Sequence, residues 1–159
     1  MPTKVIFYAL SDDKASEDAK NVVENVEQQA LQKAAELTLE SVSRKARVTV
    51  LCDTQKQAEA FDEFIWQYPP ERFIPHNLYG EGPDMGTPVE ILWQSAYQSM
   101  RQLRNKAVLI NLSQAYIEQQ SGIQQIIDFV PHDEELKVLA RERYKRYKQA
   151  GCQLDYQTV

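Results

Sequence analysis

Short runs of apolar residues alternate along the chain with longer segments that mix apolar and polar positions. The short runs are rich in β-branched and aromatic residues, which is typical of buried strands. In the longer segments the apolar residues recur at helical spacing, which is typical of helices packed on one side. The predicted strands are Val5–Leu10, Arg47–Cys52, Val89–Trp93, Ala107–Leu112 and Ile126–Val130.

Two of the longer segments predict helices. The residues from about Glu17 to Ser43 contain no Gly or Pro, and they follow the first predicted strand. A second helix is expected after Asp53 or Thr54, either of which can cap its first turn, and Pro69 should end it. Its apolar positions are Ala58, Phe61, Ile65 and Phe64.

The segment from Tyr68 to Pro88 is expected to be a loop region, because it holds five of the seven prolines and three of the five glycines. One short extended piece is predicted within it, at Phe73–Pro75. A short helix is predicted between the last two strands.

The helix near the C-terminus has the clearest end signals. Asp133 is a suitable N-cap, acidic residues follow in the first turn, and Gly151 is a natural C′ residue. At about 100° per residue, one face is apolar and an adjacent stripe about 60° wide groups three cations with one tyrosine. The predicted apolar face is Leu136, Leu139, Ala140, Tyr147 and Ala150. The stripe is Lys137, Arg141, Tyr144 and Lys148.

Apolar strands separated by helices indicate an α/β fold, with a mostly parallel central sheet flanked by helices and a Rossmann-like topology. No internal repeat or linker interrupts the pattern. We therefore expect residues 1–159 to form a single domain, which is a usual size for one hydrophobic core.

The charge of the chain is negative overall but unevenly distributed. A formal net charge of -5 and a pI near 5.1 argue against broad attraction to nucleic acid. Positive charge is nevertheless concentrated in the last helix, so its partner should be a small acidic feature. Six of the 18 basic residues lie there: Lys137, Arg141, Arg143, Lys145, Arg146 and Lys148.

Several classes of function lack their sequence signals. No stretch approaches the roughly 20 apolar residues of a membrane helix, so we expect a cytoplasmic protein. His76, His132 and the two cysteines show no metal-ligand spacing, and we expect no metal and no cofactor. The glycine-rich stretch Gly80–Gly86 has the wrong spacing for a phosphate-binding loop and precedes a strand. No catalytic constellation is present, although loose carboxylates such as Asp128 leave room for one.

Two surfaces have both a structural and a functional interpretation. The cationic stripe is either a solvated helix face, a receptor for a carboxylate-rich peptide, or, least in keeping with the acidic chain, a base-stacking surface. Trp66 and Phe73 either close the edge of the core or form an exposed aromatic patch for a partner protein.

The order of several motifs closely resembles the chi subunit family of bacterial DNA polymerase III. The motifs are FYAL, DTQKQAEAFDEFIW, RFIPHNLYGEGP, PVEILW, DFVP and LARERYKRYKQAG, and they extend over nearly the whole chain. The resemblance implies a non-catalytic adaptor of the replication machinery, cytoplasmic and associated with the nucleoid. Its implied partners are the psi subunit of the clamp loader, the acidic Phe-terminated tail of the single-stranded-DNA-binding protein, and a helicase-like repair protein. DNA would be contacted only indirectly.

The resemblance also implies which residues bind. The tail site would comprise Val130 of DFVP together with Lys137, Arg141 and Tyr144 of the last helix. The surface for psi or the helicase-like protein would comprise Trp66 and Phe73. A nucleotide-binding α/β enzyme and a direct nucleic-acid binder are the alternative interpretations, and the acidic pI and missing phosphate loop weigh against both.

Overall fold

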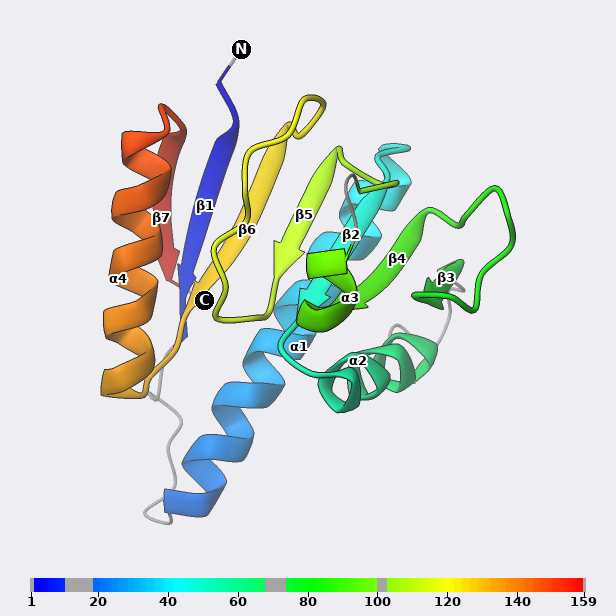
Figure 1. Ribbon diagram of the computed structural model, residues 1–159. Helices are drawn as coiled ribbons and strands as arrows, with labels where there is room; N and C mark the ends of the chain where they lie inside the picture. Colours follow the sequence, from blue (N-terminus) through cyan, green and yellow to red (C-terminus); the bar gives the residue numbers. More distant parts are fainter. Residues whose placement is uncertain (1, 11–18, 68–73, 100–102, 159) are drawn as a thin grey trace.

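The computed structural model describes residues 2–10, 19–67, 74–99 and 103–158 (Figure 1). The strands are β1 (Lys4–Ala9), β2 (Val48–Cys52), β3 (His76–Leu78), β4 (Val89–Trp93), β5 (Val108–Asn111), β6 (Gln125–Val130) and β7 (Gln153–Thr158). The helices are α1 (Ala19–Ser43), α2 (Gln55–Gln67), α3 (Gln94–Ser99) and α4 (Glu134–Gln149).

The strands form one seven-stranded sheet in the order β3-β4-β2-β5-β6-β1-β7. Every neighbouring pair in this order is parallel. The predicted α/β fold with a mostly parallel sheet is therefore confirmed. The central strands are buried on both faces, which is why they appear in the sequence as continuous apolar runs.

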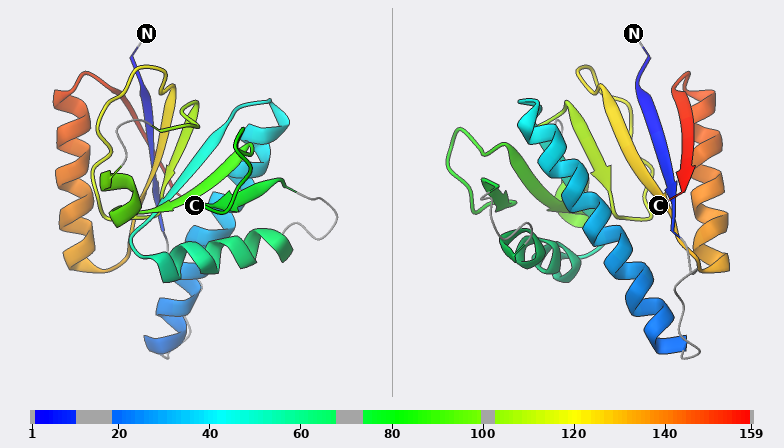
Figure 2. Two further views of the ribbon diagram at one scale, coloured as in Figure 1. Left: turned by 45° about the vertical axis from the view of Figure 1, so that its right-hand side comes forward. Right: turned by 180° about the vertical axis from the view of Figure 1, so that it is seen from behind.

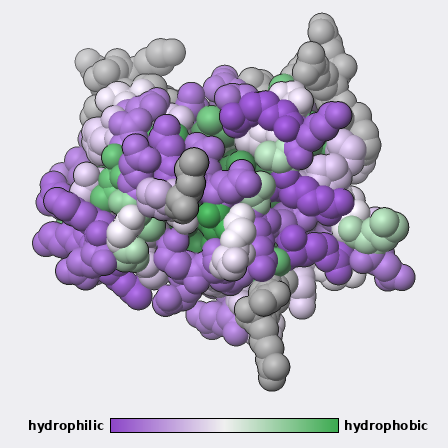
Figure 3. Space-filling model, turned by 90° about the horizontal axis from the view of Figure 1, so that it is seen from above, coloured by the Kyte–Doolittle hydropathy of each residue, from purple (hydrophilic) through white to green (hydrophobic). Residues whose placement is uncertain are grey.

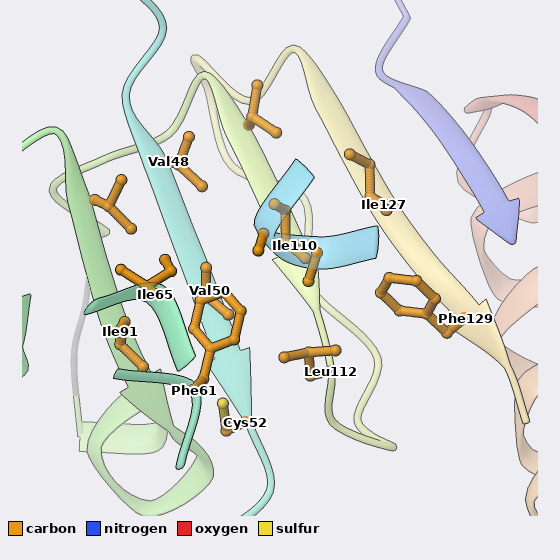
Figure 4. Close-up of a cluster of buried hydrophobic side chains, with 14 of the residues drawn as sticks. Val48, Val50, Cys52, Phe61, Ile65, Ile91, Ile110, Leu112, Ile127 and Phe129 are labelled. Atoms are coloured by element: carbon orange, nitrogen blue, oxygen red, sulfur yellow. The ribbon is translucent and has the colours of Figure 1, made fainter. Parts of the chain in front are cut away.

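Helices cover both faces of the sheet (Figure 2). α1 and α2 pack on one face, where Phe61 and Ile65 of α2 meet the side chains of the central strands (Figure 4). α4 and the loop 112–124 cover the other face, with Tyr147 of α4 fully buried. The core between the sheet and the helices α1 and α2 includes Val48, Val50, Ile91, Ile110, Ile127 and Phe129.

The face of the molecule drawn in Figure 3 is mostly hydrophilic. Seen from above Figure 1, apolar residues form only small separate patches (Figure 3). Within the described residues, no helix combines the length and hydropathy that a membrane crossing requires.

The predicted strands and the two long helices are present, and the strand ends differ from the predicted ones by one residue at most. The predicted start of the first helix, Glu17, and the proline expected to end the second, Pro69, lie outside the described residues. Thr54 caps α2, since its Oγ1 accepts a hydrogen bond from the Gln57 amide at 3.1 Å. Of the extended piece predicted at Phe73–Pro75, Phe73 lies outside the described residues, and Ile74 and Pro75 precede the strand β3, which begins at His76. Pro75 has no N–H to donate to a ladder, so strand pairing begins after it.

The short helix predicted between the last two of these strands, β5 and β6, is absent, because residues 112–124 form turns and irregular backbone. Asn111 begins this loop with local hydrogen bonds: its Oδ1 accepts from the Ser113 amide at 3.0 Å, and its Nδ2 donates to the Ala115 carbonyl at 2.8 Å. Such side-chain bonds to nearby backbone compete with helix formation. A short helix, α3, instead follows β4 directly.

β7 was not predicted, and its burial explains why. It pairs along its whole length with β1, but only Leu154 is partly buried. An edge strand that is exposed on both faces has no apolar run for the sequence to show.

α4 has the predicted ends. The Asp133 side chain accepts hydrogen bonds from the Glu135 and Leu136 amides at 2.9 and 3.1 Å, and Gly151 has φ +87°. The predicted apolar face is wrong in part, because Leu139 is 40% exposed and Ala150 is also exposed. The buried residues of α4 are Ala140, Arg143 and Tyr147.

Candidate functional site

The cationic stripe of α4, comprising Lys137, Arg141, Tyr144 and Lys148, lies on the flank that faces β1. The Tyr144 ring is 36% exposed, and its centroid lies 5.3 Å from that of the buried Phe7 ring of β1. Arg141 and Lys148 are exposed, and Lys137 is half-buried. The structure therefore brings together the cations and the aromatic ring that the helical spacing grouped.

The opposite flank of α4 faces the loop 112–124. The Arg146 guanidinium stacks 3.8 Å from the centroid of the Tyr116 ring and lies 3.6 Å from a Glu118 carboxylate oxygen. Arg146 thus contacts the loop 112–124 and lies on the opposite side of the helix from the stripe.

Val130 belongs to the same face of the sheet as the stripe. It is the last residue of β6 and pairs in register with Ala9 of β1. Two residues earlier on each strand, Asp128 pairs with Phe7. Paired residues of parallel strands point to the same side, and two residues along a strand span about 7 Å. Val130 therefore lies one neighbour away, on the same side of the sheet, from the Phe7 ring on which Tyr144 packs. It is half-buried.

The charge of the stripe is available to a partner. Lys137 Nζ is 3.5 Å from the carboxylate of the exposed Glu134, a pairing of little energetic weight at such exposure. Among the residues that the structure describes, Arg141 and Lys148 form no ion pair. Arg141 can therefore take a carboxylate without breaking an existing bridge.

Arg143, counted above among the cations of the last helix, points into the protein. It is 3% exposed, and its Nε and Nη2 each lie 3.0 Å from an oxygen of the Asp128 carboxylate, which is fully buried. Its Nη1 donates to the carbonyl and to the side chain of Gln114 at 3.1 and 3.2 Å. We call these three residues the Arg143 network. It fastens α4 to β6 and to the loop 112–124.

Asp128, left above as a possible catalytic carboxylate, is thus a buried partner of a structural arginine. Burial raises the pKa of Asp128, while the charge and hydrogen bonds of Arg143 oppose that rise. The Phe129 amide donates to its Oδ1 at 2.7 Å, and Asn111 Nδ2 donates to its Oδ2 at 3.3 Å. The sequence carried a signal for this pair: a single acid in an apolar strand, and an arginine spaced three residues after Ala140 and four before Tyr147, which places it on the buried face of α4.

The second predicted surface is described only in part. Trp66, at the end of α2, is 59% exposed, and its ring centroid lies 4.9 Å from that of His76 on β3. Phe73 lies outside the described residues. The sheet order puts β3 and β7 at opposite edges, about 29 Å apart for six strand spacings. Trp66 and the cationic stripe therefore lie at opposite ends of the sheet.

A cleft of about 810 Å³ opens at the carboxyl edge of the sheet, beyond the ends of β2, β5 and β6. Open α/β sheets usually bind ligands at this edge. The walls combine apolar side chains of α1 and α4 with the polar residues Asp53, Gln57 and Asn111. One oxygen of the Asp53 carboxylate, Oδ1, accepts hydrogen bonds from Gln94 Nε2 and from the Gln114 amide at 2.5 and 2.9 Å.

The glycine-rich loop Gly80–Gly86 connects β3 and β4 and has structural reasons for its glycines. Gly80 and Gly86 have φ of +85° and +75°. A side chain at Gly82 would collide with that of Asn77. The loop therefore needs glycine for its backbone path, whether or not a ligand is bound.

Neither cysteine belongs to a reactive or metal-binding centre in the part of the chain that the structure describes. Cys52 and Cys152 are free thiols, and burial raises the pKa of Cys52 to about 12, which disfavours its reactive thiolate form. Over the described ranges, no group of three or more His, Cys, Asp or Glu side chains is arranged to hold a metal ion.

Comparisons with known proteins place the chain among replication proteins. A family model described as "DNA polymerase III chi subunit, HolC" matches residues 2–155. DNA polymerase III subunit chi of Escherichia coli K12 is 39% identical over 152 residues, which cover 96% of this chain and 95% of that protein. The Haemophilus influenzae Rd protein of the same name is 42% identical over 113 residues, covering 71% and 76%.

A solved structure shares the fold. T4 UvsW superposes with a TM-score of 0.67 at 11% identity, over 99% of this chain and 41% of that one. At this identity the likeness concerns the arrangement of strands and helices alone, and the chain spans less than half the length of UvsW.

Proposed function

Because the chain belongs to the DNA polymerase III chi subunit family, it is an accessory subunit of the replicative polymerase, and we propose that it acts there as an adaptor. In this proposal one surface binds the acidic, Phe-terminated tail of the single-stranded-DNA-binding protein. A second surface binds the psi subunit of the clamp loader. The polymerase is thereby linked to template that is already coated.

The observation that carries this proposal is the cationic stripe. An acidic protein presents Lys137 and the unpaired Arg141 beside the half-exposed ring of Tyr144 and close to Val130. An arginine fork can take a carboxylate through two hydrogen bonds, and an aromatic wall can take an apolar ring. A peptide that ends in phenylalanine offers both chemistries at one residue.

The expected affinity is moderate. Burying a phenylalanine side chain contributes roughly 1.5 to 3 kcal/mol, and each hydrogen bond to a charged group adds about 1.5 to 3 kcal/mol. Part of that energy offsets the loss of translational freedom and the ordering of a flexible tail. The expected dissociation constant is in the micromolar range, which corresponds to a binding free energy of about -8 kcal/mol. Such a complex exchanges quickly enough for a moving replication fork.

The position of Trp66 supports a separate partner surface. Its exposed ring at the β3 edge is of the kind that anchors protein interfaces. We propose that this edge, including Phe73, binds psi or a helicase-like repair protein. Because the stripe lies at the other end of the sheet, the two partners can bind together, as an adaptor requires.

The test is a fluorescence-anisotropy titration of a labelled acidic peptide ending in Phe. The proteins are the wild type, Arg141→Ala, and Arg146→Ala as a control with the same change of charge on the same helix. Saturable binding that Arg141→Ala weakens and Arg146→Ala leaves intact is expected. If the wild type does not bind, or if both variants lose affinity equally, the tail surface is wrong.

A pull-down with psi tests the other surface. Trp66→Ala is expected to lose psi while still binding the tail peptide, and Arg141→Ala is expected to show the reverse. Loss of both partners in either variant would contradict two separate surfaces. In the same experiment, retention of bare single-stranded DNA by the wild type would favour direct binding of nucleic acid instead.

A further inference from the structure

Tyr156 of β7 is an exposed aromatic side chain on the same face of the sheet as the cationic stripe. It is 57% exposed and pairs in register with Phe7 of β1. Phe7 points toward α4, because its ring lies 5.3 Å from that of Tyr144 and 6.1 Å from that of Tyr147. Residues paired across parallel strands project to the same side, so Tyr156 also projects to the α4 side.

α4 leaves the middle of β7 uncovered, since Tyr156 is exposed while Leu154 is half-buried. The helix begins just after β6 and ends at the turn that leads into the start of β7, with β1 between those two strands. Its last turns therefore cover the beginning of β7, where Leu154 is half-buried against the core. Two residues later Tyr156 is exposed, on the side of α4 that carries Lys137, Arg141 and Tyr144.

The α4 side of β7 carries no charge. Leu154, Tyr156 and Thr158 all project to that side. Asp155 pairs with Ile6 and projects to the opposite side. An acidic peptide drawn to the stripe therefore meets an uncharged, partly aromatic strand rather than a repelling carboxylate.

The free backbone edge of β7 is partly closed to strand addition. The Gln153 amide donates to the Thr3 carbonyl of the neighbouring chain segment at 2.9 Å, so the Tyr156 amide, three residues on, points to the open edge. Asp155 Oδ1 accepts from this amide at 2.9 Å, and Gln157 Nε2 donates to Asp155 Oδ2 at 3.3 Å. A ligand thus meets β7 through side chains, with Tyr156 the largest of them.

We propose that Tyr156 is a further binding residue for the acidic tail and contacts the ring of its terminal phenylalanine. This inference rests on the proposed adaptor function. The terminal carboxylate lies at Arg141 and Lys137, and the ring is bordered by Tyr144 from the helix and by Tyr156 from the edge strand. β7 thereby becomes the second side of the binding surface.

A double-mutant cycle between protein and peptide tests this contact. Anisotropy titrations use two labelled acidic peptides that differ only in their last residue, Phe or Ala, against the wild type, Tyr156→Ala, Tyr156→Phe and Arg141→Ala. Tyr79→Ala, which directly follows β3 at the opposite edge of the sheet, is the matched control for loss of an exposed tyrosine. Tyr156 is exposed, so its variants are expected to unfold at the wild-type urea midpoint.

Tyr156→Ala is expected to weaken binding of the Phe peptide about threefold to tenfold, the range for one aromatic pair, and to leave the Ala peptide unaffected. Tyr156→Phe and Tyr79→Ala should bind like the wild type. An unchanged affinity for the Phe peptide, or an equal loss with both peptides, would overturn the contact. If Arg141→Ala still loses the tail in that case, the adaptor function stands without Tyr156. If the wild type binds neither peptide, both proposals fail.

Discussion

Arg141 and Arg143 lie two residues apart on α4 and have entirely different surroundings. Arg141 is exposed and forms no ion pair within the described residues, whereas Arg143 is 3% exposed and bound to Asp128 and Gln114. Two residues turn the helix by about 200°, so one side chain faces solvent and the other faces the sheet. The comparison shows that one short cationic sequence can provide both an exposed positive surface and the internal ion pair that fixes the helix carrying it.

The two regions should differ most clearly in what they contribute to stability. A buried ion pair is not strong evidence of net stabilisation, because two charges have been removed from water. Removing one partner alone is nevertheless costly, since the other charge is left buried without compensation. An exposed arginine stays in contact with water, so it neither gains the attraction of a buried ion pair nor loses its hydration.

The largest effect is expected from breaking the Arg143 network. Asp128→Ala should lower the free energy of unfolding by about 3 to 5 kcal/mol, because it leaves the Arg143 guanidinium buried and unpaired. Urea unfolding followed by circular dichroism measures this. The double variant Arg143→Met with Asp128→Leu is the control, and it should recover most of the loss. A single variant that costs less than about 1 kcal/mol would show that the network does not fasten α4.

The exposed member of the comparison should show the reverse pattern. Arg141→Ala should change the free energy of unfolding by less than about 0.5 kcal/mol, yet cost about 1.5 to 3 kcal/mol in tail binding. Urea unfolding and peptide titration of the same preparation separate the two quantities. A large loss of stability would mean that Arg141 has a structural role that its exposure does not reveal.

A smaller effect is expected at Asp133, the N-cap of the helix that carries both Arg141 and Arg143. Asp133→Ala should lower the free energy of unfolding by about 1 kcal/mol, because two amides in the first turn of α4 lose their acceptor. Asp133→Asn should retain most of the wild-type stability, since its side chain also accepts hydrogen bonds. Equal losses in the two variants would assign the effect to the carboxylate charge rather than to the cap.

The smallest and most selective effect is that of salt. Raising the salt concentration from about 0.05 to about 0.5 M should weaken tail binding severalfold, because the Debye length that screens exposed charges falls from about 14 Å to about 4 Å. The Asp128–Arg143 pair is buried, so the difference in unfolding free energy between the wild type and Asp128→Ala should change little. Tail binding that is insensitive to salt would remove the stripe's charges from the mechanism.

Much of the fold could be predicted from the sequence because the central strands are buried on both sides. Runs such as Val48–Cys52 are short, continuous and rich in β-branched residues, which is typical of such strands. The exposed edge strand β7 could not be predicted, since pairing with β1 rather than burial holds it in place. The helix predicted in residues 112–124 was wrong because local bonds from Asn111 and the Arg143 contact to Gln114 favour an irregular loop.

By itself, the sequence determined the alternation of strands and helices, the ends of α4 and the grouping of Lys137, Arg141 and Tyr144. These features depend on neighbours in the chain and on helical periodicity, and its motifs also pointed to the family. The internal position of Arg143 and the pairing of Tyr156 with Phe7, on the α4 side of the sheet, became apparent from the folded chain alone. Both depend on partners distant in sequence, Asp128 on β6 and Phe7 on β1, and a linear pattern does not contain that proximity.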